Sequence, residues 1–285
     1  MNIDPACVDC IINQSKRVAS AIHADKKLTS EIIKAVEEMA PGFSFNQSPP
    51  EVAAAVYEKM AKIAGKDDLY DEVKKLSTQK AQAFVPYLQK EVAFSSSPLL
   101  TATKIAVAGN VIDLAAEYAF DLNEELDKIF HTSFAVNDFE QLKKRLGEVS
   151  NVLYIADNAG EHIFDLIYIK TILSLYPNIS LTYMTRGNAI INDVTYEEAQ
   201  EAGFGEVCEL ISSGVNTPGF VYDRANLASQ KLFDESELII TKGMGNYECL
   251  SNVKKENLFF LLKVKCNVVA NSIGKEVGDI ICKRL

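Results

Sequence analysis

Acidic and amide side chains follow directly on an apolar run in the stretch NVLYIADNAGE, residues 151–161. Asp157 and Asn158 offer the oxygen ligands that Mg²⁺ and Mn²⁺ prefer, and Glu161 could act as a general base or orient a ligand. An Asp-Asn pair at the end of a strand is more commonly a turn or a helix cap, because both side chains accept N–H bonds from a first helical turn. The metal-binding interpretation therefore needs support from other parts of the chain.

Two further polar turns supply that support. RGNAIINDVT, residues 186–195, carries Asp193, a third oxygen ligand, and TKGMGNYE, residues 241–248, carries Lys242 and an alternative general base, Glu248. A lysine beside glycines could neutralise a phosphate, because glycines let backbone N–H groups approach the anion. The P-loop, dinucleotide-binding and serine-hydrolase motifs are absent from the sequence. Three polar turns after three separate apolar runs favour a cleft that binds a metal and a phosphate.

The elements that position these turns change character along the chain. Residues 1–148 show helical apolar spacing almost throughout, whereas from residue 151 short apolar runs alternate with helical segments. This pattern predicts an α/β fold, in which a helical N-terminal portion (1–148) packs on a mostly parallel three-layer α/β region (149–285) and shares its core. The strands are expected at residues 152–157, 179–186, 206–214, 237–243 and 266–271. In such a sheet ligands bind beyond the carboxyl ends of the strands, where the three turns lie.

Composition narrows the class of protein. The chain has 285 residues, a formal net charge of −10 and no basic cluster, so nucleic acid and anionic membranes are not expected as partners. Its six cysteines do not form a disulfide framework, there is no signal-peptide pattern, and no apolar run approaches the roughly 20 residues that span a bilayer. We therefore expect a soluble, cytoplasmic protein. Its oligomeric state is left open.

Other polar residues carry weaker signals. Asn110 and Asp113 lie three residues apart in a strongly apolar helical segment, so they either satisfy each other in the core or point into the cleft. Cys7 and Cys10 form half of a zinc site that a distant cysteine such as Cys266 could complete, although buried helix cysteines are more typical.

Taken in order, CVDC, AGNVID, ADNAGE, RGNAIINDVT, TKGMGNYE and LKVKC resemble the family called domain of unknown function 89, the metal-dependent damage-control phosphatases, and its prokaryotic branch in particular. One eukaryotic branch is also described as a protein-glutamate methyltransferase. The resemblance spans essentially the whole chain and implies a helical portion on an α/β sheet. It implies Asp157, Asn158 and Asp193 as ligands of Mg²⁺, Mn²⁺, Co²⁺ or Ni²⁺. It also implies a set of substrate or phosphate contacts, namely Lys242, Gly243, Gly245, Asn246, Asn110, Asp113, Arg186 and Lys265.

The expected function is that of a metal-dependent phosphoric monoester hydrolase acting on a small phosphorylated metabolite. Asp157, Asp193 and Glu161 are the expected catalytic acids, and direct attack by water is preferred over an aspartyl-phosphate on Asp157. Arg186 departs from a lysine that is commoner at its position, which retains a cation with a different geometry. The alternatives are an S-adenosylmethionine-dependent carboxyl methyltransferase, disfavoured by the Asp-Asn strand end, and a non-catalytic protein that binds a metal or metabolite.

Overall fold

A mostly parallel sheet forms the centre of the molecule. The computed structural model describes the backbone of residues 1–115, 128 and 130–285, and the side chains of these residues except those of 110–115. The described strands form one sheet in the order β1-β7-β6-β5-β2-β3-β4, and its pairings are parallel except that of β6 with β7. The strands are β1 (Val136–Asn137), β2 (Asn151–Ile155), β3 (Ser180–Thr185), β4 (Glu209–Ser212), β5 (Leu238–Lys242), β6 (Leu258–Lys263) and β7 (Ile280–Arg284). This confirms the predicted mixed α/β class.

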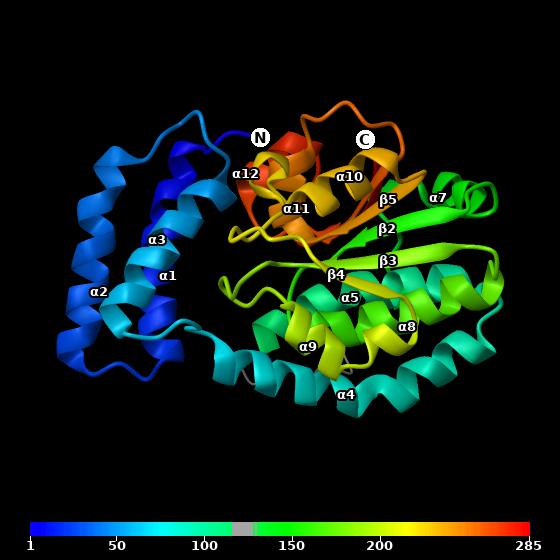
Figure 1. Cartoon of the computed structure of the whole chain (residues 1–285), viewed down its shortest axis with the longest axis horizontal. Coiled ribbons are helices and arrows are strands. Elements are labelled where there is room, and N and C mark those ends of the chain that lie inside the picture. The colour runs from blue at the N-terminus through cyan, green and yellow to red at the C-terminus, as the bar shows by residue number, and fades with distance from the viewer. Residues whose placement is uncertain (116–127, 129) are drawn as a thin grey trace.

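Helices cover both faces of the sheet, as Figure 1 shows. One face packs against α5 (Pro98–Ala115) and α8 (Glu161–Leu175), on whose outer side α4 (Asp71–Phe94) lies, and the other against α10 (Leu227–Glu235), α11 (Gly243–Leu250) and α12 (Asn267–Ile273). Alternate residues of β2 enter the two cores, with Val152 and Tyr154 in one and Leu153 and Ile155 in the other. A strand buried on both faces needs apolar side chains in both directions, which explains its unbroken apolar run. None of the described helices is both long and apolar enough to cross a bilayer.

A separate helical cluster lies at one end of the sheet (Figure 1). It consists of α1 (Pro5–Ala21), α2 (Lys26–Met39) and α3 (Pro49–Ala64), whose apolar faces form a third core. Ile190 and Ile191, from the turn after β3, and Val268, from the segment after β6, pack into this core. The cluster therefore faces the carboxyl ends of the strands. The remaining elements are α7 (Phe139–Leu146), α9 (Tyr196–Glu201) and short 3-10 turns at Ala40–Gly42, Phe204–Glu206 and Tyr222–Arg224.

The structure corrects two expectations about individual elements. Residues 266–271 were expected to be a strand, but they belong to helix α12, because the Cys266 side chain accepts the backbone N–H of Val269 and Gly274 ends the helix at φ 72°. In addition, β1 lies inside the region expected to be entirely helical. It pairs with β7 at the far end of the chain, so the first 148 residues contribute a strand to the sheet.

Candidate active site

Strand pairing places the three predicted turns at the same edge of the sheet, at the carboxyl ends of the strands. β2 lies between β3 and β5, and its last residue, Ile155, pairs with Met184 on one side and Thr241 on the other. The chain continues from β2 toward β3 and β4 and later returns to β5 on the opposite side, so β2 marks the switch point of the sheet. A cleft at the carboxyl end of the strands is expected at such a point. Asp157 and Lys242 leave the sheet there side by side.

The turn after β3 folds back onto the end of β2. Asn158 and Asp193 form an isolated antiparallel bridge, and the backbone N–H of Val194 donates to the carbonyl of Asp157 at 2.9 Å. Ile191 adopts a φ of 46°, which is strained for a β-branched residue and is held by its packing on the α1–α3 core. The structure thus places the predicted ligands Asp157, Asn158 and Asp193 on two adjoining backbone segments.

Arg186 lies between the two aspartates. Its Nε donates to Oδ2 of Asp193 at 2.6 Å, and its Nη2 lies 3.8 Å from Oδ1 of Asp157. The side chain is buried, and neither terminal nitrogen has a hydrogen-bond partner among the described residues. Buried guanidinium groups ordinarily use their donors, so two unused nitrogens beside the carboxylates leave donors for another group.

The charge around Asp157 is unbalanced. Burial raises the pKa of Asp157 well above its usual range, and the neighbouring Glu161 and Asp193 raise it further, whereas Arg186 and Lys265 act in the opposite direction. The carboxyl group also lies against Gly243, the first residue of α11. A helix N-terminus favours negative charge, but the acids still outnumber the cations that reach them. A bound cation would offset this excess.

The donor set suits a hard divalent cation. The Nδ2 of Asn158 donates to Oδ2 of Asp157 at 2.9 Å and lies 3.4 Å from Oε2 of Glu161, which turns the amide oxygen of Asn158 away from both acids. Within the described residues, no three His, Cys, Asp or Glu side chains form a metal-binding group by themselves. The carboxylates of Asp157 and Asp193 offer part of the oxygen shell with which proteins commonly hold Mg²⁺ while leaving positions for water and substrate, and Asn158 would join them only with its amide oxygen turned toward them.

Lys242 occupies a different place from the one expected of a phosphate ligand. Its buried ammonium group donates to the carbonyl of Ala106 at 2.7 Å, to Oδ1 of Asp165 at 2.7 Å and to Oε1 of Glu161. An ammonium group has three N–H donors, so these contacts use all of them. The geometry makes Lys242 a residue that positions Glu161. Direct phosphate binding by Lys242 stays a prediction and would require one of these bonds to break.

Asp165, Tyr154 and Tyr183 also belong to this buried network, although none of them was predicted as a site residue. Asp165 accepts hydrogen bonds from the hydroxyl groups of Tyr154 at 2.7 Å and Tyr183 at 3.1 Å, and from Lys242. Burial raises the pKa of Asp165 to about 6, while Lys242 lowers it. The available clue was a single acid inside the apolar helical stretch IFDLIYI, because a buried acid must find partners.

Comparison with known proteins identifies the family of this chain. The model of the damage-control phosphatase ARMT1-like domain matches residues 3–281. The chain belongs to this family. A damage-control phosphatase of Archaeoglobus fulgidus is 31% identical over 289 residues, covering 99% of each chain, and one of Pyrococcus horikoshii is 29% identical over 286 residues, covering 100% of this chain and 98% of the relative. The crystal structure of a DUF89 family protein from Pyrococcus horikoshii superposes with a TM-score of 0.90 at 28% identity, over 100% of this chain and 99% of that one. The names of these relatives support a phosphatase role.

Two other predicted phosphate contacts have structural roles in this ARMT1-like domain. The amide of Asn246 is buried, and it donates to the carbonyls of Ala156 and Lys242 and accepts the backbone N–H of Phe220. A Cβ at Gly245 would fall 1.9 Å from the carbonyl oxygen of Pro218, so glycine is required for the approach of that loop. Both residues support the loops of the site, and direct contact with phosphate stays a prediction for each of them.

The remaining predicted site residues are placed as follows. Lys265 lies just beyond β6, half-buried, and its charge reaches Asp157. Glu248 lies on α11, where burial raises its pKa to about 7. Asn110 and Asp113 lie on α5, but their side chains fall outside the described residues. Their predicted place near the cleft stays a prediction.

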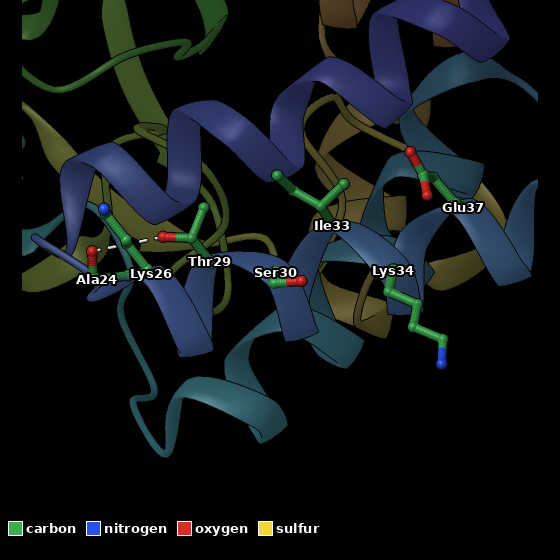
Figure 2. Close-up of a pocket in the computed structure, with 7 residues that line it drawn as sticks. All are labelled: Ala24, Lys26, Thr29, Ser30, Ile33, Lys34 and Glu37. Atoms are coloured by element: carbon green, nitrogen blue, oxygen red, sulfur yellow. Dashed lines mark hydrogen bonds between the residues drawn. The ribbon is translucent and has the colours of Figure 1, made fainter.

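Features far from the carboxylates do not add to this site of the ARMT1-like domain. The hollow drawn in Figure 2 lies along α2 and is lined by Thr29, Ile33 and neighbouring residues of that helix, none of which was predicted as a site residue. Cys7 is buried and Cys10 is exposed at the start of α1, while Cys266 caps α12. Across the described part of the chain, these cysteines join no metal-binding group of three His, Cys, Asp or Glu side chains.

Proposed function

We propose that this chain is a metal-dependent phosphatase that hydrolyses a small phosphorylated metabolite. One observation carries the proposal. Arg186 is held between the carboxylates of Asp157 and Asp193, and neither of its terminal nitrogens has a hydrogen-bond partner among the described residues. Carboxylates can hold a metal ion, and a neighbouring guanidinium group with unused donors can bind phosphoryl oxygens. The arrangement therefore suits a substrate whose phosphoryl group contacts both.

Each residue of the site has a role in this scheme. A divalent cation held by Asp157, Asn158 and Asp193 would polarise the phosphoryl group. The terminal nitrogens of Arg186 bind phosphoryl oxygens, and Glu161, fixed by Lys242, keeps the amide of Asn158 in its orientation. A water oxygen forms the new bond to phosphorus and the ester P–O bond breaks. A carboxylate of the site takes a proton from the water and passes it to the leaving oxygen, so that an alcohol and inorganic phosphate are released.

The substrate class we propose is a sugar phosphate or the phosphate of a damaged cofactor precursor. The names of the two relatives, both damage-control phosphatases, support the phosphatase role, and the substrate class itself rests on the resemblance of the motifs. We place the activity in the cytoplasm, because all six cysteines of the chain are free, as is typical of proteins in reducing compartments.

Hydrolysis of p-nitrophenyl phosphate by EDTA-stripped protein tests the proposal, with Mg²⁺, Mn²⁺, Co²⁺ and Ni²⁺ added back separately. We expect turnover only with a metal, and its loss in Asp157→Ala and Asp193→Ala. The control is Asp9→Ala, which removes an exposed acid on α1 and should leave turnover unchanged. Circular dichroism checks that each variant is folded.

Two results would contradict the proposal. Turnover that persists in Asp157→Ala or Asp193→Ala would show that the chemistry takes place elsewhere. Absence of turnover with every metal, both for p-nitrophenyl phosphate and for a panel of hexose and pentose phosphates, would overturn the phosphatase assignment and leave a binding protein.

A further inference from the structure

A cavity borders two of the backbone segments that carry the candidate active site. It has a volume of about 680 Å³ and opens between α4 and the segment that runs from Gly187 to α9. Two of its lining residues are sequence neighbours of site residues: His162 follows Glu161, and Gly187 follows Arg186. On each of these two backbone segments, one residue therefore belongs to the candidate active site and the next residue lines the cavity.

His162 borders this cavity with a buried side chain. Its imidazole is fully buried and stacks on Phe204, and its Nδ1 accepts the backbone N–H of Gly160 at 2.9 Å. Burial, with the charge of Lys74 nearby, lowers the pKa of His162 to about 3, so the ring is neutral. A neutral imidazole that accepts at Nδ1 carries its proton on Nε2. That Nε2–H has no partner among the described residues, although a buried donor ordinarily has one.

The charged groups of the cavity select against anions. Lys74 is only 2% exposed, and its ammonium group is paired with Asp68 at 2.6 Å and with Glu198 at 2.8 Å. In all, five carboxylates and two lysines line the cavity, and the second lysine, Lys75, is paired with Asp71. The excess of carboxylates disfavours a phosphate or any other polyanion.

The neutral side chains complete the recognition chemistry. Thr78, Gln79, Gln82 and Asn188 add hydroxyl and amide groups to the lining. A hydroxyl group can donate to a carboxylate and accept from an amide or from the Nε2–H of His162, whereas a cation can only donate. We propose that this cavity is a second binding site, for an uncharged polyhydroxyl compound such as a sugar or polyol that carries no phosphate.

The proposed site does not depend on the phosphatase assignment. Its ligand would contact residues 187–189, which follow Arg186, and His162, which follows Glu161. Binding can be measured on metal-free protein without any turnover, so failure of one proposal leaves the other standing.

Ligand-observed NMR on the full-length, metal-stripped chain tests the inference, with D-ribose, D-fructose and sorbitol as probes. Inorganic phosphate and spermidine serve as the anionic and cationic comparisons. The blocking variant is Gln82→Trp, because Gln82 is an exposed residue on α4 at the cavity, so a large side chain there obstructs it without entering the core. The matched control is Gln89→Trp, the same change at an exposed position farther along α4 that does not line this cavity.

We expect at least one of the three polyhydroxyl probes to bind the wild type and Gln89→Trp, and its signal to be lost in Gln82→Trp. A second variant, His162→Phe, keeps the stacked ring but removes the Nε2 donor together with the Nδ1 acceptor of the Gly160 N–H, so its fold is checked by circular dichroism. It should weaken binding about tenfold, as the loss of one buried hydrogen bond does. The inference is overturned if no polyhydroxyl probe binds, if binding survives Gln82→Trp, or if only spermidine or phosphate binds in the cavity.

Discussion

The carboxyl group of Asp157 lies directly against the α-carbon of Gly243, where a Cβ would fall 1.9 Å from Oδ2. Gly243 also has a φ of 77°, a value that L side chains rarely adopt. The acid at the end of β2 can therefore occupy its position only because the first residue of α11 has no side chain. The glycine after Lys242 thus makes room for the acid that follows the neighbouring strand, and its predicted contact with phosphate stays a prediction.

Replacement of Gly243 should therefore remove activity. We expect Gly243→Ala to displace Asp157 and to lower kcat at least about 100-fold, because a misplaced catalytic group loses about that much. Gly274→Ala is the matched control, since Gly274 has a φ of 72° and a Cβ added to it would meet nothing within 4 Å. Gly274→Ala forces alanine into a similar positive φ, but its Cβ meets no neighbouring atom. Equal kcat values for the two variants would contradict the importance of this contact.

Lys242 should contribute strongly to stability. In Lys242→Met, the carboxylates of Glu161 and Asp165 would remain buried without their cation, which typically costs about 3–5 kcal/mol. Urea unfolding followed by circular dichroism measures this loss. Lys75→Met, which breaks the exposed pair with Asp71, is the control and should cost less than about 1 kcal/mol. A small loss for Lys242→Met would show that the buried network rearranges easily.

Asp165 should give the stability of the protein a pH dependence. Its pKa is raised to about 6 by burial, so between pH 4 and pH 6 the folded chain keeps a proton that the unfolded chain releases. Stability from this group is thus present below pH 4 and is lost as the pH rises to about 6, by roughly 3 kcal/mol in all. Asp165→Asn has no such titration. The difference between the unfolding free energies of the two proteins should therefore change across this window, and parallel curves would contradict the assignment.

Metal binding should be visible without turnover. If Asp157, Asn158 and Asp193 hold a divalent cation, Mn²⁺ at about 100 times its Kd should stabilise the folded chain by roughly 2.7 kcal/mol. A thermal melt before and after EDTA measures the shift. Asp193→Asn should abolish most of the shift while keeping a side chain of the same size. A shift of the same size in Asp193→Asn would place the metal elsewhere.

The fold class could be predicted because strands buried on both faces leave unbroken apolar runs such as VLYI, and because these alternate with helical spacing. The edge strand β1 could not be predicted from the sequence. β1 has two residues and pairs with a strand more than 140 residues away, so no local pattern marks it. Residues 266–271 contain two adjacent valines that favour a strand, but the caps at Cys266 and Gly274 and the packing of Val269 made them a helix.

The positions of Asp157, Asn158 and Asp193 followed from the rule that ligands lie beyond the carboxyl ends of parallel strands. The role of Lys242 did not, because its three acceptors come from α5 and α8, and motif spacing says nothing about how a helix packs over a strand end. Lys74 was missed for the same reason, and the full burial of His162, which follows Glu161 in the sequence, was not expected. Each is a polar residue whose burial depends on contacts between distant segments.

The bond from Lys242 to the carbonyl of Ala106 joins residues 136 positions apart. Glu161 and Asp165 leave the ribosome well before Lys242, and until it emerges their carboxylates have no buried cation to receive them. A nascent chain therefore cannot complete the candidate site ahead of the rest of the fold. Synthesis that stops before β5 yields a chain whose Glu161 and Asp165 lack their buried cation, so the candidate site forms only in a molecule whose two halves have already met.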